Sequence, residues 1–100
     1  MTFSVLAEPS RRHILDLLRE GERSVGELVD DLHLSQPGVS KHLRVLRQAG
    51  LVDVRADAQR RLYQLRPEPL EELDAWLAPY RRFWSARLDA LEAHLAKDGG

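Results

Sequence analysis

The segment Leu34–Val52 (LSQPGVSKHLRVLRQAGLV) constrains the fold more than any other part of the chain. Ser35 can cap the first free amides of a helix, and Pro37 suits the first helical turn, where its missing N–H costs nothing. Three apolar residues then recur at i, i+4 and i+7, namely Val39, Leu43 and Leu46. Such a stripe is typical of a helix packed on a core, and Gly50 ends it. The segment therefore predicts a helix over about 36–49.

The face of this helix opposite the apolar stripe contains no carboxylate. At 100° per residue, that face carries hydroxyl, ammonium, guanidinium and amide groups, from Ser40, Lys41, Arg44 and Gln48. These groups contact phosphates and base edges in a DNA major groove. An ordinary solvated basic face is the alternative, but the pattern favours a recognition helix.

The net charge of −1 conceals an uneven distribution along the chain. Residues 1–34 contain four basic and seven acidic side chains, a net of −3. Residues 35–66 contain seven basic and two acidic side chains, a net of +5, and residues 67–100 return to −3. Because local potential governs nucleic-acid binding more than net charge does, this distribution also favours DNA as the partner.

The helix before the basic helix is predicted from a capping box. Ser24 and Glu27 have the S-x-x-E spacing, and the apolar residues that follow repeat at three and four. A tight turn at His33-Leu34 then predicts a helix-turn-helix. Upstream, a short helix over 3–7 and a second helix capped by Ser10 are expected.

A β-hairpin is expected after the basic helix. Residues 51–56 and 60–66 are typical of two strands, separated by the turn residues Asp57-Ala58-Gln59. Together with the helices, this order predicts a mainly α fold with a small β-hairpin, ααααββα.

Three ordered segments of the chain resemble the ArsR/SmtB family of winged helix-turn-helix repressors: Leu6–Leu18 (LAEPSRRHILDLL), Ser24–Val52 and the hairpin-like Val54–Leu65 (VRADAQRRLYQL). The resemblance implies a homodimeric repressor bound to double-stranded DNA. Its two recognition helices would enter successive major grooves of a pseudo-palindromic operator, roughly 34 Å apart. Repression would follow because the dimer occupies promoter DNA.

Nine residues are candidates for DNA contact: Ser35, Gln36, Ser40, Lys41, His42, Arg44, Arg55, Arg60 and Arg61. Gln36 and Arg44 are the best candidates for base reading. Ser40 and Lys41 are expected to fix the phosphate backbone, and His42 to contact a phosphate or pack between helices. The wing arginines would bind phosphates or reach into the minor groove.

The C-terminal segment is expected to form a dimer interface. Its apolar residues repeat at near-heptad spacing, and the interface is predicted at Leu77, Tyr80, Trp84, Leu88 and Leu91. Pro79 should kink or divide this helix. The whole chain, 1–100, is expected to be one domain, with its wing over about 51–66 and dimerisation helices over about 1–7 and 68–97.

Other classes of function have little support in the sequence. No nucleophile elbow, phosphate-binding glycine loop or cofactor motif is present, so we expect neither an enzyme nor a cofactor. The chain has no cysteine, and Ser24 and Gly26 stand where the family's thiolate site would lie. The family's second metal site is incomplete around Asp89 and His94, so no metal is expected. No apolar run is long enough to cross a membrane, which favours a cytoplasmic protein without a membrane partner.

Two alternative functions stay open at this point. A metal- or small-molecule-responsive sensor of the same fold could use a pocket lined by aromatic residues, namely Trp76, Tyr80, Phe83 and Trp84. The second alternative is a protein-interaction module on a winged-helix scaffold. Such a module would not need a basic third-helix face or a basic wing, so the charge distribution argues against it.

Overall fold

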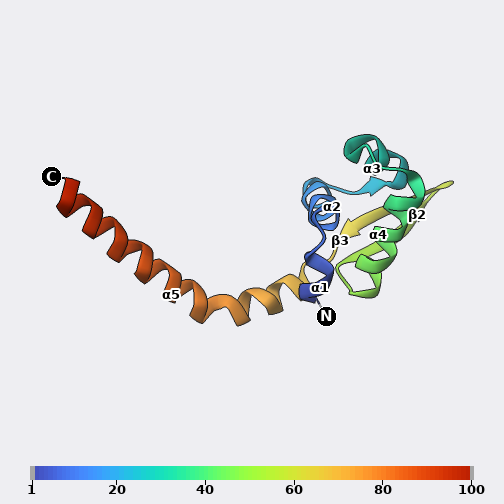
Figure 1. Ribbon diagram of the computed structural model, residues 1–100. Coiled ribbons are helices and arrows are strands. Elements are labelled where there is room, and N and C mark those ends of the chain that lie inside the picture. Colours follow the sequence, from blue (N-terminus) through green and yellow to red (C-terminus); the bar gives the residue numbers. More distant parts are fainter. Residues whose placement is uncertain (1, 100) are drawn as a thin grey trace. The chain divides into compact units, whose positions relative to one another are not determined.

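The computed structural model describes the backbone of residues 2–99 and the side chains of residues 3–96. Figure 1 shows its elements, in the order α1 (Thr2–Leu6), α2 (Pro9–Glu20), β1 (Arg23–Ser24), α3 (Val25–Leu32), α4 (Gln36–Gln48), β2 (Val52–Asp57), β3 (Arg60–Leu65) and α5 (Glu68–Gly99). The described residues fall into two compact units, divided between Leu70 and Glu71. The first unit contains the core, and the second is the greater part of α5.

The core lies where α2, α3 and α4 pack together with the sheet. Five of its side chains are 0% exposed: Ile14, Leu28, Val39, Leu46 and Leu51. Each such burial stabilises the fold by about 1.5–3 kcal/mol relative to an exposed side chain. Val39 and Leu46 belong to the stripe that predicted α4, so the same residues that indicate the helix also anchor it.

Two of the three predicted N-cap residues, Ser24 and Ser35, are confirmed. Ser24 accepts a hydrogen bond from the Glu27 amide at 3.2 Å, and the Glu27 carboxylate accepts one from the Ser24 amide at 3.1 Å. The prediction that Ser10 caps α2 is wrong, because Glu8 is the N-cap and Pro9 is the first helical residue. The fixed φ of proline suits that first position, so the helix begins before Ser10.

The sheet contains one strand more than the sequence predicted. Its order is β1-β3-β2, with both pairs antiparallel, and β1 aligns Arg23 with Tyr63 and Ser24 with Leu62. A strand of two residues is too short to show the alternation by which strands are recognised, and it exists because β3 offers it an edge. The predicted β2–β3 hairpin is present.

The boundaries of the predicted elements shift by small amounts. The basic helix ends at Gln48, and Ala49 is its C-cap. The turn of the wing contains only Ala58 and Gln59, since Asp57 pairs with Arg60. Ala58 has a φ of 56°, which lies in the left-handed region.

The two predicted dimerisation helices correspond to α1 and α5. Met1, part of the first prediction, lies outside the described residues. Pro79 does not divide α5, which runs continuously although the proline has no N–H to donate to the preceding turn. The prediction of a single domain stays a prediction; the second unit is one stretch of helix, and none of its described side chains, those of residues 71–96, is buried.

Candidate nucleic-acid interface

The turn between α3 and α4 sets the direction of the basic helix. His33 closes α3 in a left-handed conformation with a φ of 57°, and its amide donates to the Val29 carbonyl at 2.9 Å. Leu34 is half-buried and packs against the core. The chain therefore reverses within a few residues, and α3 and α4 form a helix-turn-helix (Figure 1).

The start of α4 is held by Ser35. Its hydroxyl oxygen accepts from the Gly38 amide at 3.1 Å, so only the hydroxyl proton is available to an external acceptor. A Cβ at Gly38 would lie 3.1 Å from the same oxygen, closer than ordinary packing allows. The exposed Gln36 follows the cap directly, at the end of the helix where a recognition helix contacts bases.

The outer face of α4 carries exposed cations. Lys41, Arg44 and Arg47 are spaced three residues apart and are all exposed. Their side chains make no hydrogen bond or ion pair with any other residue in the part of the chain that the structure describes. The helix itself has no acidic residue, so the positive charge of this face is not neutralised locally. Ser40 lies beside it and is half-buried.

His42 lies on a different side of α4 from these cations. It is half-buried, and its Nδ1 accepts a hydrogen bond from the Arg11 Nε of α2 at 3.3 Å. This contact fits the packing alternative for His42. A phosphate contact stays a prediction, and it would have to use Nε2, because Nδ1 is already bonded.

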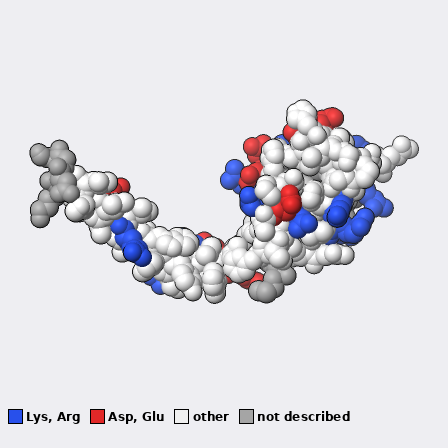
Figure 2. All heavy atoms as spheres, in the orientation of Figure 1, with Lys and Arg blue, Asp and Glu red and all other residues white. Residues whose placement is uncertain are grey.

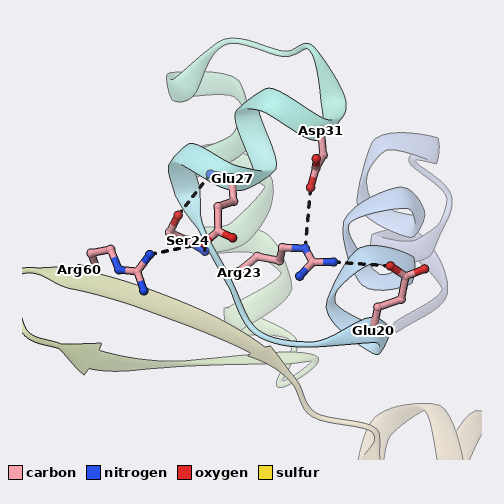
Figure 3. Close-up of polar contacts among 6 residues, drawn as sticks. All are labelled: Glu20, Arg23, Ser24, Glu27, Asp31 and Arg60. Carbon is pink, nitrogen blue, oxygen red and sulfur yellow. Dashed lines mark hydrogen bonds and ion pairs between the residues drawn. The ribbon is translucent and has the colours of Figure 1, made fainter.

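The three wing arginines differ in their surroundings. Arg55 forms a two-point ion pair with Glu22, with its Nε and a terminal nitrogen at 2.6 and 3.0 Å from the two carboxylate oxygens. Arg60 lies 3.8 Å from Glu27 (Figure 3) and 3.6 Å from Asp57. Arg61 is exposed and has no such partner among the described side chains. Of the three wing arginines predicted to contact DNA, one is therefore unpaired and two are paired.

Sequence reasoning missed the ion pairs that join the wing arginines to Glu22 and Glu27. It counted charge by segment, and Glu22 and Glu27 belong to the acidic N-terminal segment, far in sequence from the wing. The pairing of β1 with β3 brings that segment close to the wing. No local sequence signal indicates such a pairing.

The pKa values of Glu22 and Glu27 are both lowered, which favours their charged form. A hydrogen bond from Arg55 lowers the pKa of Glu22, and the same contact raises the pKa of Arg55. The pKa of Glu27 is lowered first by the Ser24 amide and hydroxyl, and to a smaller extent by Arg60 and Arg23. Figure 3 shows that Arg23 lies between Glu20 and Asp31. Both Glu22 and Glu27 are therefore anionic at neutral pH.

Several basic side chains gather on one part of the first unit. Figure 2 shows basic side chains over the region where Figure 1 draws α4 and the β2–β3 hairpin. The tip of that hairpin extends past α4 (Figure 1). A helix with an unneutralised cationic face beside a projecting hairpin matches the electrostatic footprint of a DNA-binding domain.

The apolar face of α5 is exposed in the single chain. The predicted interface residues Tyr80, Trp84, Leu88 and Leu91 are 46–60% exposed, and Leu77 is half-buried. Trp76 and Phe83 are also exposed, and the Trp76 and Tyr80 rings contact each other with centroids 4.8 Å apart. The aromatic side chains therefore lie on a surface, and none of them is buried in a core of the single chain.

The described residues give no indication of a metal centre or a membrane span. Among the described side chains, those of residues 3–96, no three histidine or acidic groups converge on a common point where an ion could be held. None of the helices in that range combines the length and the apolar character needed to cross a bilayer.

The helix-turn-helix, the cationic α4 and the hairpin define a winged helix-turn-helix DNA-binding protein. Residues 8–54 match the family model described as bacterial regulatory protein, arsR family. The chain is 40% identical over 97 residues to the HTH-type transcriptional regulator Rv2034 of Mycobacterium tuberculosis, covering 97% of this chain and 88% of that protein. The chain belongs to the ArsR family. Proteins of this family are transcriptional regulators, which are not enzymes, and they bind double-stranded DNA.

Further relatives agree with this family. The transcriptional repressor SdpR of Bacillus subtilis is 32% identical over 75 residues, covering 75% of this chain and 83% of that protein. The crystal structure of a possible transcriptional regulator for arsenical resistance superposes with a TM-score of 0.70 at 42% identity. That likeness covers 91% of this chain and 92% of the other. The protein is thus a DNA-binding regulator of transcription.

Proposed function

We propose that this protein is a homodimeric repressor that acts in the cytoplasm and reads a pseudo-palindromic operator with α4. The observation that carries the proposal is the exposed row Lys41, Arg44 and Arg47, whose charges have no carboxylate partner among the described residues. A cationic helix face of this kind is available to DNA without first breaking contacts inside the protein. Named repressors among the relatives support the direction of regulation.

The α4 residues divide by chemistry into base readers and phosphate contacts. Gln36 at the start of the helix and Arg44 on its outer face present an amide and a guanidinium, which read adenine and guanine edges respectively. Lys41, Ser40 and the Ser35 hydroxyl proton fix the register on the phosphate backbone. In the wing, Arg61 is available at once, whereas Arg55 and Arg60 reach a phosphate only after leaving their carboxylates.

A second copy of the chain is the proposed partner of the α5 face. An exposed apolar surface that contains Tyr80, Trp84 and Leu88 marks an interaction site, because such patches are unfavourable in water. Members of the ArsR family are commonly dimers. A two-fold dimer would set the distance between two α4 helices and hence between two half-sites; a contribution from α1 stays a prediction.

The proposal is tested by DNA binding in two formats. A salt titration of fluorescence anisotropy on a random duplex should give a steep fall in affinity with rising salt, since phosphate contacts release counterions. In vitro selection should recover two inverted half-sites about 10–11 base pairs apart, centre to centre. A flat salt dependence would contradict DNA binding, and a single unrepeated half-site would contradict the dimeric operator complex.

A further inference from the structure

The carboxylate of Glu22 and the guanidinium of Arg55 meet across the sheet of the wing. Glu22 lies in the connection between α2 and β1, and Arg55 lies on β2, 33 residues later in the chain. Both carboxylate oxygens are used, at 2.6 and 3.0 Å, so the contact is a two-point pair with defined geometry. Such pairs are stronger and more specific than a single contact between point charges.

Strand register explains why these two side chains meet. Leu62 of the central strand β3 is paired with Ser24 of β1 on one side and with Arg55 of β2 on the other. Residues paired directly across strands point to the same face of the sheet, so all three side chains share one face. Glu22 precedes Ser24 by two residues and continues the alternation on that face. Arg60, two residues before Leu62, shares it, whereas Arg61 points to the opposite face. The face with the acidic partners therefore contains both paired arginines.

The Glu22–Arg55 pair is accessible enough for DNA to compete with it. The side chains are 33% and 49% exposed, so a phosphate can reach the guanidinium from solvent. The lowered pKa of Glu22 shows that the carboxylate stays charged near neutral pH, so it persists as a competitor for the guanidinium. A phosphate that binds Arg55 has to displace the Glu22 carboxylate. The contact therefore contributes less binding free energy than a contact from an unpaired arginine would.

We propose that Glu22 determines specificity by keeping Arg55 paired when the protein binds random DNA, so that Arg55 adds no sequence-independent phosphate contact. The proposal rests on the DNA-binding function proposed above and refines it. Because the base contacts of α4 do not depend on this pair, a carboxylate that restrains the wing lowers binding to random DNA and so raises the ratio of operator to random affinity.

The experiment compares Glu22→Gln with the wild type on one random duplex across a range of salt concentrations. Glutamine keeps the shape of glutamate but loses its charge, so Arg55 becomes available for one further phosphate. The slope of log affinity against log salt should steepen by about 0.9. The ratio of E22Q affinity to wild-type affinity for the random duplex should accordingly fall by roughly threefold to fourfold between 50 and 200 mM salt.

Two further variants isolate the ion pair. Asp30→Asn removes one negative charge from α3 at an exposed residue that has no ion pair within the described range, so it controls for net charge and should leave the slope at its wild-type value. Arg55→Gln alone should also leave the slope on random DNA unchanged, because Glu22 already occupies that arginine. In the double variant E22Q/R55Q, the effect of E22Q should disappear.

Each other outcome rejects either this inference or the function on which it rests. An unchanged slope in E22Q rejects the inference, and weaker binding would show instead that Glu22 positions Arg55 for DNA. An effect of E22Q that persists without Arg55, or that Asp30→Asn reproduces, also rejects it. If the wild type itself shows no salt-dependent binding to any duplex, the DNA-binding function is what fails.

Discussion

Arg44 is exposed at the centre of the cationic row on α4, and its role can be separated from that of a wing arginine. Replacing Arg44 by alanine should weaken operator binding by about 1–3 kcal/mol and relax the preference at one base position in each half-site. Arg61→Ala should instead weaken operator and random duplexes alike and reduce the salt slope by about one. Competition binding against a panel of single-base operator variants distinguishes these results. Identical behaviour of the two variants would contradict the division between base reading and phosphate contact.

Ala58 occupies a backbone conformation that suits other residues better. Its φ of 56° brings the Cβ close to the following carbonyl, a strain that asparagine tolerates by local hydrogen bonding. Ala58→Asn should therefore raise the free energy of unfolding by about 0.5–1 kcal/mol, measured in urea, while Ala58→Val should lower it. Gln59→Asn, next to it but without a positive φ, is the matched control and should change little. Equal effects at 58 and 59 would show that the turn does not select for this conformation.

At the scale of elements, the start of α3 links its capping box to the wing. Glu27 accepts from the Ser24 amide and also lies near Arg60 of β3 (Figure 3). Its folded-state pKa is lowered from 4.5, so the charge stabilises the fold above that value and this contribution is lost as pH falls through the folded pKa. Neutral glutamine can keep the capping hydrogen bond but not the charge.

Glu27→Gln is accordingly expected to be less stable than the wild type at pH 7 and to approach it at pH 3. Urea unfolding at the two pH values measures the difference in the free energy of unfolding between the variant and the wild type. The contributions of the other carboxylates cancel in this difference, because both proteins contain them. A difference that is the same at both pH values would mean that the charge of Glu27 contributes nothing to stability.

At the scale of the whole molecule, the α5 face couples assembly to DNA binding. Trp84 is 48% exposed in the single chain, so its truncation should affect the dimer far more than the fold of one chain. Trp84→Ala should weaken dimerisation by about 2 kcal/mol or more, or roughly 30-fold, as buried interface tryptophans do. Operator affinity should fall with it, although Trp84 is not among the proposed DNA contacts.

Analytical ultracentrifugation over a range of concentrations measures the dimerisation constant directly. Arg82→Ala is the matched control, because position 82 lies on the opposite face of α5 at helical spacing and is exposed. A wild type that stays monomeric at micromolar concentration would contradict the dimer and the operator spacing derived from it.

The response to metal is a second property of the whole molecule. Ser24 and Gly26 replace the expected thiolates, and Ser24 is committed to capping α3. We therefore expect that neither chelator nor added Zn²⁺ changes operator affinity, measured by anisotropy in parallel titrations. A tenfold change at modest zinc concentration would favour the metal-responsive alternative.

The sequence by itself determined the elements that depend on near neighbours. The apolar stripe of α4, the Ser35 cap and the Ser24–Glu27 box all join residues within a few positions, so their spacing is visible in the chain. The exposed cations of α4 follow from the same periodicity, because residues opposite a buried stripe face solvent. For the same reason, the helix-turn-helix and the hairpin were predictable together.

Only the tertiary structure decided which charges are neutralised. β1 forms because β3 offers an edge, and that pairing brings Glu22 to Arg55 and Glu27 to Arg60. Likewise, Arg11 reaches His42 only because α2 packs against α4. These partners lie 31–33 residues apart in the chain. Such contacts depend on how strands and helices pack, and periodicity along the chain contains no information about that packing.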